Sequence, residues 1–247
     1  LTMSYVDISE SNAAAIRTDL LDIDLDNVNV YSSNYMAAWT GPGQNQDETG
    51  VSLGLGADAT STVSITNFYA ENYHHAYIYA AGSINLDNVN LGVDQYFDVL
   101  PYGKNPSGAA LGTSGADSMF TDVTSPSMYV KRTFPMMDQM TINGVLLFEE
   151  MTGASDVVSI TNSNINGNLI MQGCGVDIEM SASTIAGLES NCFNVGTNSI
   201  DMLESNIDHT AQSSAVNVSQ TQAYLQEVAI TSSTLGGANH MVYTDLG

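Results

Sequence analysis

Three carboxylates alternate in the stretch LDIDLDN at 21–27. Asp22, Asp24 and Asp26 would share one outward face of an extended strand, because successive side chains of a strand point to opposite faces. Three carboxylates that lie close together could bind calcium, which prefers oxygen ligands. The alternative, which we favour, is a solvated polar face that suppresses aggregation at a sheet edge. Neither an EF-hand loop nor a Gly-Gly-x-Gly-x-Asp repeat is present, so calcium is the one cofactor left open.

Aromatic side chains are concentrated in the segment NFYAENYHHAYIYAA at 67–81. Tyr77 and Tyr79 alternate and therefore share one face of a strand, and Tyr73 precedes them. If that face is outward, it is a stacking platform for sugar rings or a protein partner; if it is inward, it belongs to the core. Trp39, the only tryptophan, stands just before the GPG sequence and has the same two interpretations.

Basic residues are almost absent from the 247-residue chain. Only four are present against 27 acidic residues, which gives a net charge of −23. Nucleic acids and anionic membranes are excluded as partners, because neither binds without a basic patch. Lys131 and Arg132 form the only basic pair, and they lie in a long interval between repeat units. Since solenoid proteins build binding sites from such insertions, both are candidate binding residues.

Known catalytic motifs are missing from the chain. Hydrolysis of a polysaccharide needs two carboxylates across the cleaved bond, and elimination usually needs a cationic base beside a uronic acid. The Asp-Asp, Gly-His-Gly and Arg-x-Lys motifs of polygalacturonases are absent, and so is the Gly-x-Ser-x-Gly nucleophile elbow. We therefore assign no catalytic residue and favour a protein that is not an enzyme. A polysaccharide-active lyase or hydrolase stays the alternative.

Cys174 and Cys192 are the only cysteines and lie about one repeat apart. In a secreted protein a disulfide between them would be expected. The two residues differ by several positions along their strands, and this offset argues against simple stacking of one on the other. A disulfide and two free thiols both stay open.

The elements that must position these residues come from an eight-residue repeat. Its first, third and eighth positions are apolar, and its second and fourth are mostly Asp, Ser, Thr or Asn, which is the alternation of a strand with one buried face. Nine segments follow this pattern: VDISESNA at 6–13, IDLDNVNV at 23–30, VSITNFYA at 63–70, INLDNVNL at 84–91, MTINGVLL at 140–147, VSITNSNI at 158–165, IEMSASTI at 178–185, IDMLESNI at 200–207 and VAITSSTL at 228–235.

The fifth position of the repeat predicts a corner. The inward-facing residues are two positions apart from the first position to the third, but three positions apart from the third to the sixth. A straight strand cannot make that step. The fifth position is Asn27, Asn67, Asn88 and Asn162 in four of the copies. Asn tolerates the left-handed backbone conformation that short turns require.

Each repeat unit is followed by a polar turn and a second short strand, and neighbouring units begin about 20 residues apart. No amphipathic stretch is long enough for a helical repeat. The sequence therefore predicts an all-β fold, a right-handed parallel β-helix of roughly ten coils, with 1–247 as a single domain. Loop insertions are expected near 40–60 and 92–139, although the interval from Ile23 to Val63 could instead hide one coil.

The segments VSITNSNINGNLIMQG and IDMLESNIDHTAQSSAVNVSQT resemble the passenger domains of bacterial autotransporters, the host-binding and self-associating adhesins. The resemblance implies a parallel β-helix that attaches to host glycans, matrix proteins or identical molecules. It carries over no functional residue. The chain begins without an initiator Met, and we expect a processed form or a piece of a longer protein.

The leading hypothesis is a secreted or cell-surface adhesin that mediates attachment or self-association. Low lysine with abundant Asn, Ser and Thr favours an extracellular location. No apolar run approaches the length of about 18 residues that a membrane span requires, so this segment is not expected to insert into a membrane. The alternatives are the polysaccharide-active enzyme and a structural subunit that assembles into filaments.

Overall fold

The computed structural model describes most of the chain, and the part that it describes contains 23 β-strands and no helix. No helix in this part could therefore cross a membrane. The described residues are 1–11, 15–18, 22–33, 36–40, 62–71, 75–80, 83–92, 98–103, 118–131, 134–149, 157–172, 177–191, 198–208, 214–220, 225–231, 234–236 and 240–246.

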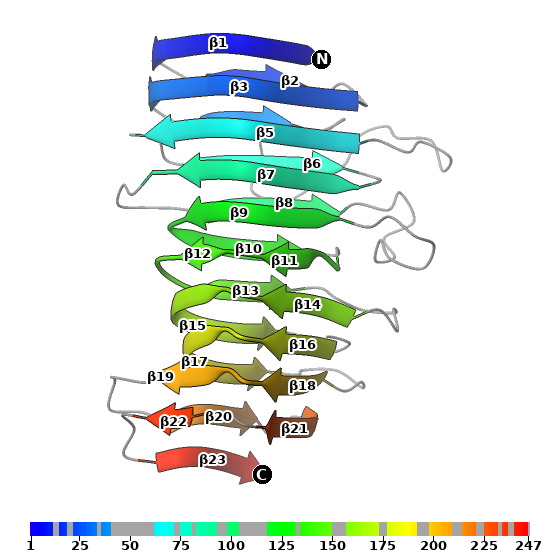
Figure 1. Ribbon diagram of the computed structural model, residues 1–247, viewed down its shortest axis with the longest axis vertical. Helices are drawn as coiled ribbons and strands as arrows, with labels where there is room; N and C mark the ends of the chain where they lie inside the picture. The colour runs from blue at the N-terminus through cyan, green and yellow to red at the C-terminus, as the bar shows by residue number, and fades with distance from the viewer. Residues whose placement is uncertain are drawn as a thin grey trace.

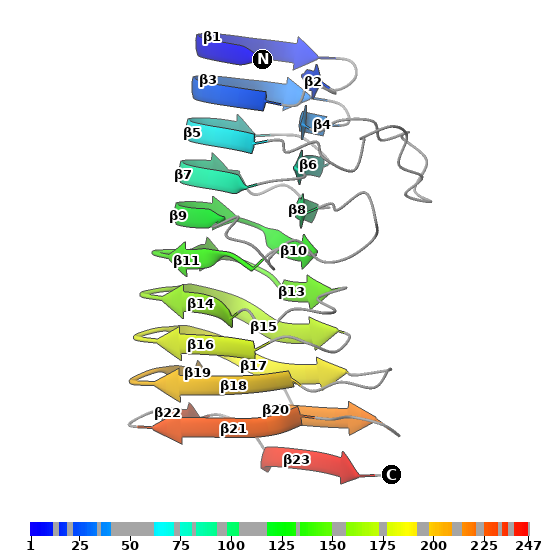
Figure 2. The same cartoon turned by 90° about the vertical axis from the view of Figure 1, so that its right-hand side faces the viewer.

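The strands stack in parallel, with the first strand at one end and the last at the other (Figure 1). In the N-terminal half, each long strand pairs with the next but one: β1 (Thr2–Ser11), β3 (Asp22–Ser33), β5 (Thr62–Glu71), β7 (Ile84–Leu91) and β9 (Met119–Ser125). A second column stands beside the first (Figure 2): β2 (Ile16–Thr18), β4 (Met36–Thr40), β6 (His75–Ala80), β8 (Asp98–Gly103) and β10 (Ser127–Lys131).

In the C-terminal half the long strands are divided in two. The parts before the division are β11 (Met136–Asp138), β14 (Val157–Thr161), β16 (Asp177–Ser181), β18 (Asn198–Leu203) and β21 (Leu225–Thr231). The parts after it are β12 (Thr141–Ile142), the starts of β15 (Asn164–Gln172) and β17 (Thr184–Asn191), β19 (Asn206–Asp208) and β22 (Thr234–Gly236). The second column continues through β13 (Leu146–Glu149), the ends of β15 and β17, β20 (Ser214–Gln220) and β23 (His240–Leu246).

Every pairing between the described strands is parallel, so the fold is an all-β parallel stack. Consecutive coils repeat the same sequence of strands, which is compatible with the solenoid that the eight-residue repeat predicts. The outer strands β1 and β23 lie at opposite ends of the stack.

One position that recurs in nine coils has a positive φ, between 48° and 56°, and β1 and β3 each have a second such residue, Glu10 and Ser32. The corners predicted at Asn27, Asn67, Asn88 and Asn162 are confirmed by these angles. The ladders align all nine corner residues with one another: Tyr5, Asn27, Asn67, Asn88, Asp122, Gln139, Asn162, Ala182 and Glu204. The corner is therefore a property of the coil, which other residue types also accept.

The core is built from inward positions that repeat in each coil. The third position of the repeat supplies one continuous column of side chains that are at most 2% exposed: Leu25, Ile65, Leu86, Phe120, Met137, Ile160, Met180 and Met202. Each such burial stabilises the fold by about 1.5–3 kcal/mol relative to an exposed side chain. The column runs from β3 to β18 and holds neighbouring coils together.

Buried serines follow the corner in the C-terminal coils. The Oγ of Ser183 accepts a hydrogen bond from the backbone N–H of Ser163 on the preceding coil, at 3.0 Å, and donates to its own coil's Ser181 carbonyl, at 2.8 Å. Ser205 accepts from the Ser183 N–H in the same way, at 3.2 Å. These side chains satisfy backbone groups that the corner leaves without a ladder partner, so a polar residue is tolerated in the core.

Two of the nine repeat units have a different register from the predicted one. The unit at 6–13 was expected to align Val6 with Ile23, but Val6 pairs with Val28 and Met3 pairs with Leu25. The coil therefore starts five residues earlier. The alternation of apolar and polar residues is the same before and after a corner, so it does not show on which side of the corner a segment lies. The corner residue of this coil is Tyr5, whereas an Asn would have indicated the position of the corner.

The unit at 140–147 has the same five-residue error. Ile142 pairs with Ile165 at the eighth position, not with Ile160 at the third. The corner of this coil is Gln139, with a φ of 56°. Its true unit begins at Pro135, where Met136 and Met137 pair with Ser159 and Ile160.

The interval 92–139, where a loop is expected, contains β8, β9, β10 and β11. Strand β9 carries an unrecognised repeat unit, with Phe120 in the core and Asp122 at the corner. In the other long interval Ile23 and Val63 are direct ladder partners, so no coil separates β3 from β5. Residues 41–61 lie outside the described part of the chain.

Candidate functional site

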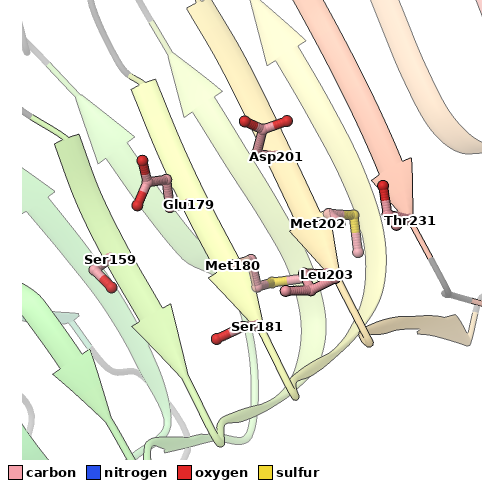
Figure 3. A pocket seen from close by; sticks show the side chains of 8 residues that line it. All are labelled: Ser159, Glu179, Met180, Ser181, Asp201, Met202, Leu203 and Thr231. Atoms are coloured by element: carbon pink, nitrogen blue, oxygen red, sulfur yellow. The ribbon is translucent and has the colours of Figure 1, made fainter.

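An open hollow of about 430 Å³ lies over the C-terminal strands β14, β16, β18 and β21. Figure 3 shows the side chains around it, on four neighbouring strands. Eight residues line this hollow: Ser159, Glu179, Met180, Ser181, Asp201, Met202, Leu203 and Thr231. Its width spans several strands, so it offers a surface for an extended ligand.

The repeat itself places the polar lining of the hollow. Glu179 and Asp201 are ladder partners at the second position of consecutive coils, and Ser159 is the partner of Glu179 on the preceding coil. Two residues further along the strands, Leu203 is the partner of Ser181 and of Thr231. Because the intervening Met180 and Met202 are buried, the side chains on either side of them face outward.

The hollow is electronegative. Glu179 and Asp201 are both exposed and stand on adjacent strands, whose backbones lie about 4.8 Å apart. From residue 133 to the end the sequence contains no lysine and no arginine. Anionic ligands are therefore repelled from this surface, whereas hydroxyl and ammonium groups can donate to its carboxylates.

The lining combines hydrogen-bonding groups with an apolar contact. Two carboxylates and three hydroxyl groups surround Leu203, whose side chain is 49% exposed. A few convergent polar groups beside an apolar surface are typical of sites that bind sugars and other small polar molecules. Two carboxylates are the number that hydrolysis of a glycosidic bond requires, whereas a cation, which elimination usually requires, is not among the eight lining residues.

The three alternating aspartates lie on β3, where Asp22 and Asp24 are exposed and Asp26 is half-buried. Asp26 accepts hydrogen bonds from the amides of Asn27, at 2.8 Å, and Asn67, at 3.0 Å. Within the described residues, no group of three His, Cys, Asp or Glu side chains is placed to hold a metal ion. Calcium binding at this strand thus receives no support from the geometry.

The ladder brings several of the predicted binding residues into common columns. Trp39 on β4 is the backbone partner of Tyr77 on β6. Tyr79 on β6 is the partner of Tyr102 on β8, which in turn pairs with Lys131 on β10. Four of the predicted residues lie outside the described part of the chain: Tyr73, Arg132, Cys174 and Cys192.

In the repeat units predicted from the sequence, the second position is acidic in four copies, at Asp7, Asp24, Glu179 and Asp201. Glu179 and Asp201 do share that position, as their ladder pairing confirms. Asp7 does not, because it pairs with Asn29 on the strand after the corner and accepts a hydrogen bond from its amide, at 2.8 Å. The displaced register of the first coil explains the error.

A pair of tyrosines on the outer surface was missed by the sequence reasoning. The rings of Tyr31 and Tyr69 have their centroids 5.9 Å apart and are tilted by 47°. Tyr31 follows the eighth position of its unit, and Tyr69 occupies the seventh position of the next. The repeat register places both on one outward surface of adjacent strands, so it contained a usable signal.

Comparison with known proteins gives no relative from which a function could be transferred. No protein-family model matches the chain, and no curated protein or solved structure is detectably similar to it. The geometry of the hollow and of the outer surface therefore carries the functional argument.

Proposed function

We propose that this protein is a right-handed parallel β-helix of roughly ten coils that binds a neutral glycan at its surface without cleaving it. The repeating strand pairs and the aligned corners support the β-helix. The resemblance to autotransporter passengers supports an adhesin that is secreted or displayed at the cell surface. Its low lysine and its Asn, Ser and Thr content favour the same location.

The hollow is the observation that carries this proposal. Its carboxylates accept hydrogen bonds from sugar hydroxyls, its own hydroxyl groups can donate or accept, and Leu203 meets an apolar patch of the sugar ring. The carboxylate pair Glu179 and Asp201 disfavours uronic acids and sialylated chains by repulsion. Neutral glycans are therefore the expected ligand class.

The test is a glycan array that includes neutral and acidic chains, probed with the wild-type protein and with the double variant Glu179→Gln/Asp201→Asn. We expect the wild type to bind neutral glycans and the double variant to bind them at least about tenfold more weakly, because charge-assisted hydrogen bonds are lost. Asp24→Asn is the matched control, since Asp24 occupies the same repeat position on β3, away from the hollow.

Retention of acidic glycans in preference to neutral ones would contradict the proposal. So would equal binding by the wild type and the double variant. The lyase alternative is less well supported, because a uronic acid substrate would meet two carboxylates and no lining cation. The hydrolase alternative is the stronger competitor, because Glu179 and Asp201 are two carboxylates in one hollow, and new reducing ends on a neutral glycan would reveal it. A filament subunit or lateral self-association is supported by a different feature, the row of polar side chains along the outer surface.

A further inference from the structure

We propose that Tyr31 and Tyr69 form a second glycan-contacting site, a stacking platform for the apolar face of a neutral pyranose ring. The platform lies on β3 and β5, whereas the hollow begins on β14. The inference takes its ligand class from the proposed function, but it rests on different residues. The two sites can therefore fail independently.

The tyrosine pair is held in a fixed arrangement. Tyr31 is 38% exposed and is the ladder partner of Glu71. The Tyr69 hydroxyl donates a hydrogen bond to Oε2 of Glu71, at 2.7 Å, so Glu71 lies beside both tyrosines. This hydrogen bond, followed by desolvation, raises the pKa of Tyr69 above its ordinary value.

The surroundings of the pair suit a sugar better than an apolar protein surface. Asn29 and Asn90 flank Tyr69 on the two neighbouring strands, and Asn90 is exposed. An amide offers both donors and an acceptor, and the carboxylate of Glu71 offers further acceptor positions. Aromatic faces bordered by such groups match a pyranose ring, which has an apolar face and a rim of hydroxyls.

The sheet does not require tyrosine at the position of Tyr69. The equivalent residues on other coils are short and polar, and they form the same parallel ladder: Asp7, Asn29, Asn90, Thr124, Thr141, Asn164, Thr184 and Asn206. Tyr31 belongs to a different row, in which its ladder partners are Ser9 and Glu71. A cross-strand aromatic contact adds only about 0.2–1 kcal/mol to a sheet. A half-exposed ring in the row of Tyr69 is thus explained better by a ligand than by stability.

The two sites are separated along the stack and also by the corner, because the residues of the hollow precede the corner and Tyr31 and Tyr69 follow it. Five ladder steps separate β5 from β16, through β7, β9, β11 and β14. At about 4.8 Å for each step, this is about 24 Å along the stack. A long polysaccharide that also passes around the corner could contact both sites, and such contact would raise its affinity over that of a short oligosaccharide.

The test measures binding of soluble neutral polysaccharides (a glucan, a galactan, a xylan and a mannan) by affinity electrophoresis. We expect Tyr31→Ala and Tyr69→Ala each to weaken binding by about tenfold, because an aromatic contact is lost. Tyr69→Phe keeps the ring and is expected to retain most of the affinity. Tyr5→Ala is the control, since Tyr5 is 82% exposed on β1 at the corner.

Far-UV circular dichroism and thermal unfolding accompany each variant. If an alanine variant fails to fold, Tyr31→Leu and Tyr69→Leu replace it, because they keep the apolar area and remove the aromatic face. The inference is overturned if the folded variants at Tyr31 and at Tyr69 both keep the affinity of the wild type. It is also overturned if the protein binds no polysaccharide in the panel. If the tyrosine variants lose affinity while Glu179→Gln/Asp201→Asn does not, the platform stands and the hollow fails.

Discussion

Asn88 stands at the corner of its coil with a φ of 51°, and its amide donates a hydrogen bond to Oδ1 of Asn67, at 2.7 Å. Asn67 in turn donates to Oδ1 of Asp26, at 3.0 Å. The corner residues thus combine a backbone conformation that most residues resist with side-chain bonds between coils. Both contributions belong to single residues and can be separated by substitution.

Asn88→Val is expected to destabilise the fold by about 1–2 kcal/mol, because a β-branched residue resists positive φ. Asn88→Gly keeps the backbone freedom and loses only the inter-coil hydrogen bond, so its effect is expected to be smaller. Chemical unfolding measures both. Asn90→Val, two residues along the same strand, is the control, and equal effects of the two valine substitutions would refute the corner explanation.

At this scale the sequence predicts the corners where Asn marks them. It also predicts the corners at Ala182 and Glu204, because both stand at the fifth position of correctly aligned units. It does not predict those at Tyr5 or Gln139, because these residues have no intrinsic preference for positive φ and the coil imposes it. The two register errors arise at such corners. The Asp122 corner was also unrecognised, and with it the whole unit on β9.

At the scale of the element, Asp138 links β11 to the following coil. Its carboxylate accepts hydrogen bonds from Thr161 Oγ1, at 2.7 Å, from the amide of Asn162, at 2.8 Å, and from the amide of Gln139, at 3.1 Å. The Thr161 hydrogen bond, followed by those of Asn162 and Gln139, holds the pKa of Asp138 below its ordinary value. The ionised form is therefore stabilised by folding.

This pKa shift predicts how the contribution of Asp138 depends on pH. Since the pKa is lower in the folded protein, the stabilisation is present above the unfolded pKa of about 3.9 and is lost as the pH falls through the folded value. Asp138→Asn is thus expected to be less stable than the wild type at neutral pH, and the gap should close below about pH 4. Urea unfolding at several pH values measures the gap.

Asp87→Asn, an exposed position on β7, is the control for that experiment. A gap for Asp138→Asn that stays constant between pH 3 and 7 would contradict the electrostatic explanation. The sequence could not identify this link, because it assigned 140–147 as the repeat unit and left Asp138 in a loop. Only the ladder places Asp138 beside Thr161.

At the scale of the whole molecule, short polar side chains form a row along the outer surface after the corner. Asn29, Thr124, Thr184 and Asn206 are half-buried or exposed members of this row. Two such rows could hydrogen-bond side by side, but a net charge of −23 opposes contact between molecules. Ionic strength sets the balance between hydrogen bonding of these rows and the charge repulsion between molecules.

We expect the protein to be monomeric in about 10 mM salt and to associate in about 0.5 M salt, because screening shortens the range of charge repulsion to a few ångströms. Sedimentation velocity at the two salt concentrations measures this directly. A monomer under both conditions would argue against lateral self-association and against the filament alternative, while leaving glycan binding untouched.

The parallel all-β architecture was predictable, because the eight-residue pattern reports which side chains face inward. The hollow was not, because its lining combines residues from 159 to 231 that only the register of four strands brings together. Glu179 and Asp201 were recognised as equivalent, yet their neighbours Leu203 and Thr231 have no motif of their own. Sites made from repeat positions leave little trace in a single sequence.

The central claim is that the protein binds a neutral glycan and leaves it intact. The most direct measurement incubates the wild-type protein with the neutral polysaccharide that it binds most tightly and quantifies bound protein and newly formed reducing ends in the same sample. We predict saturable binding with no increase in reducing ends over a buffer control. New reducing ends that increase with protein concentration, or no binding to any neutral polysaccharide, would contradict the claim.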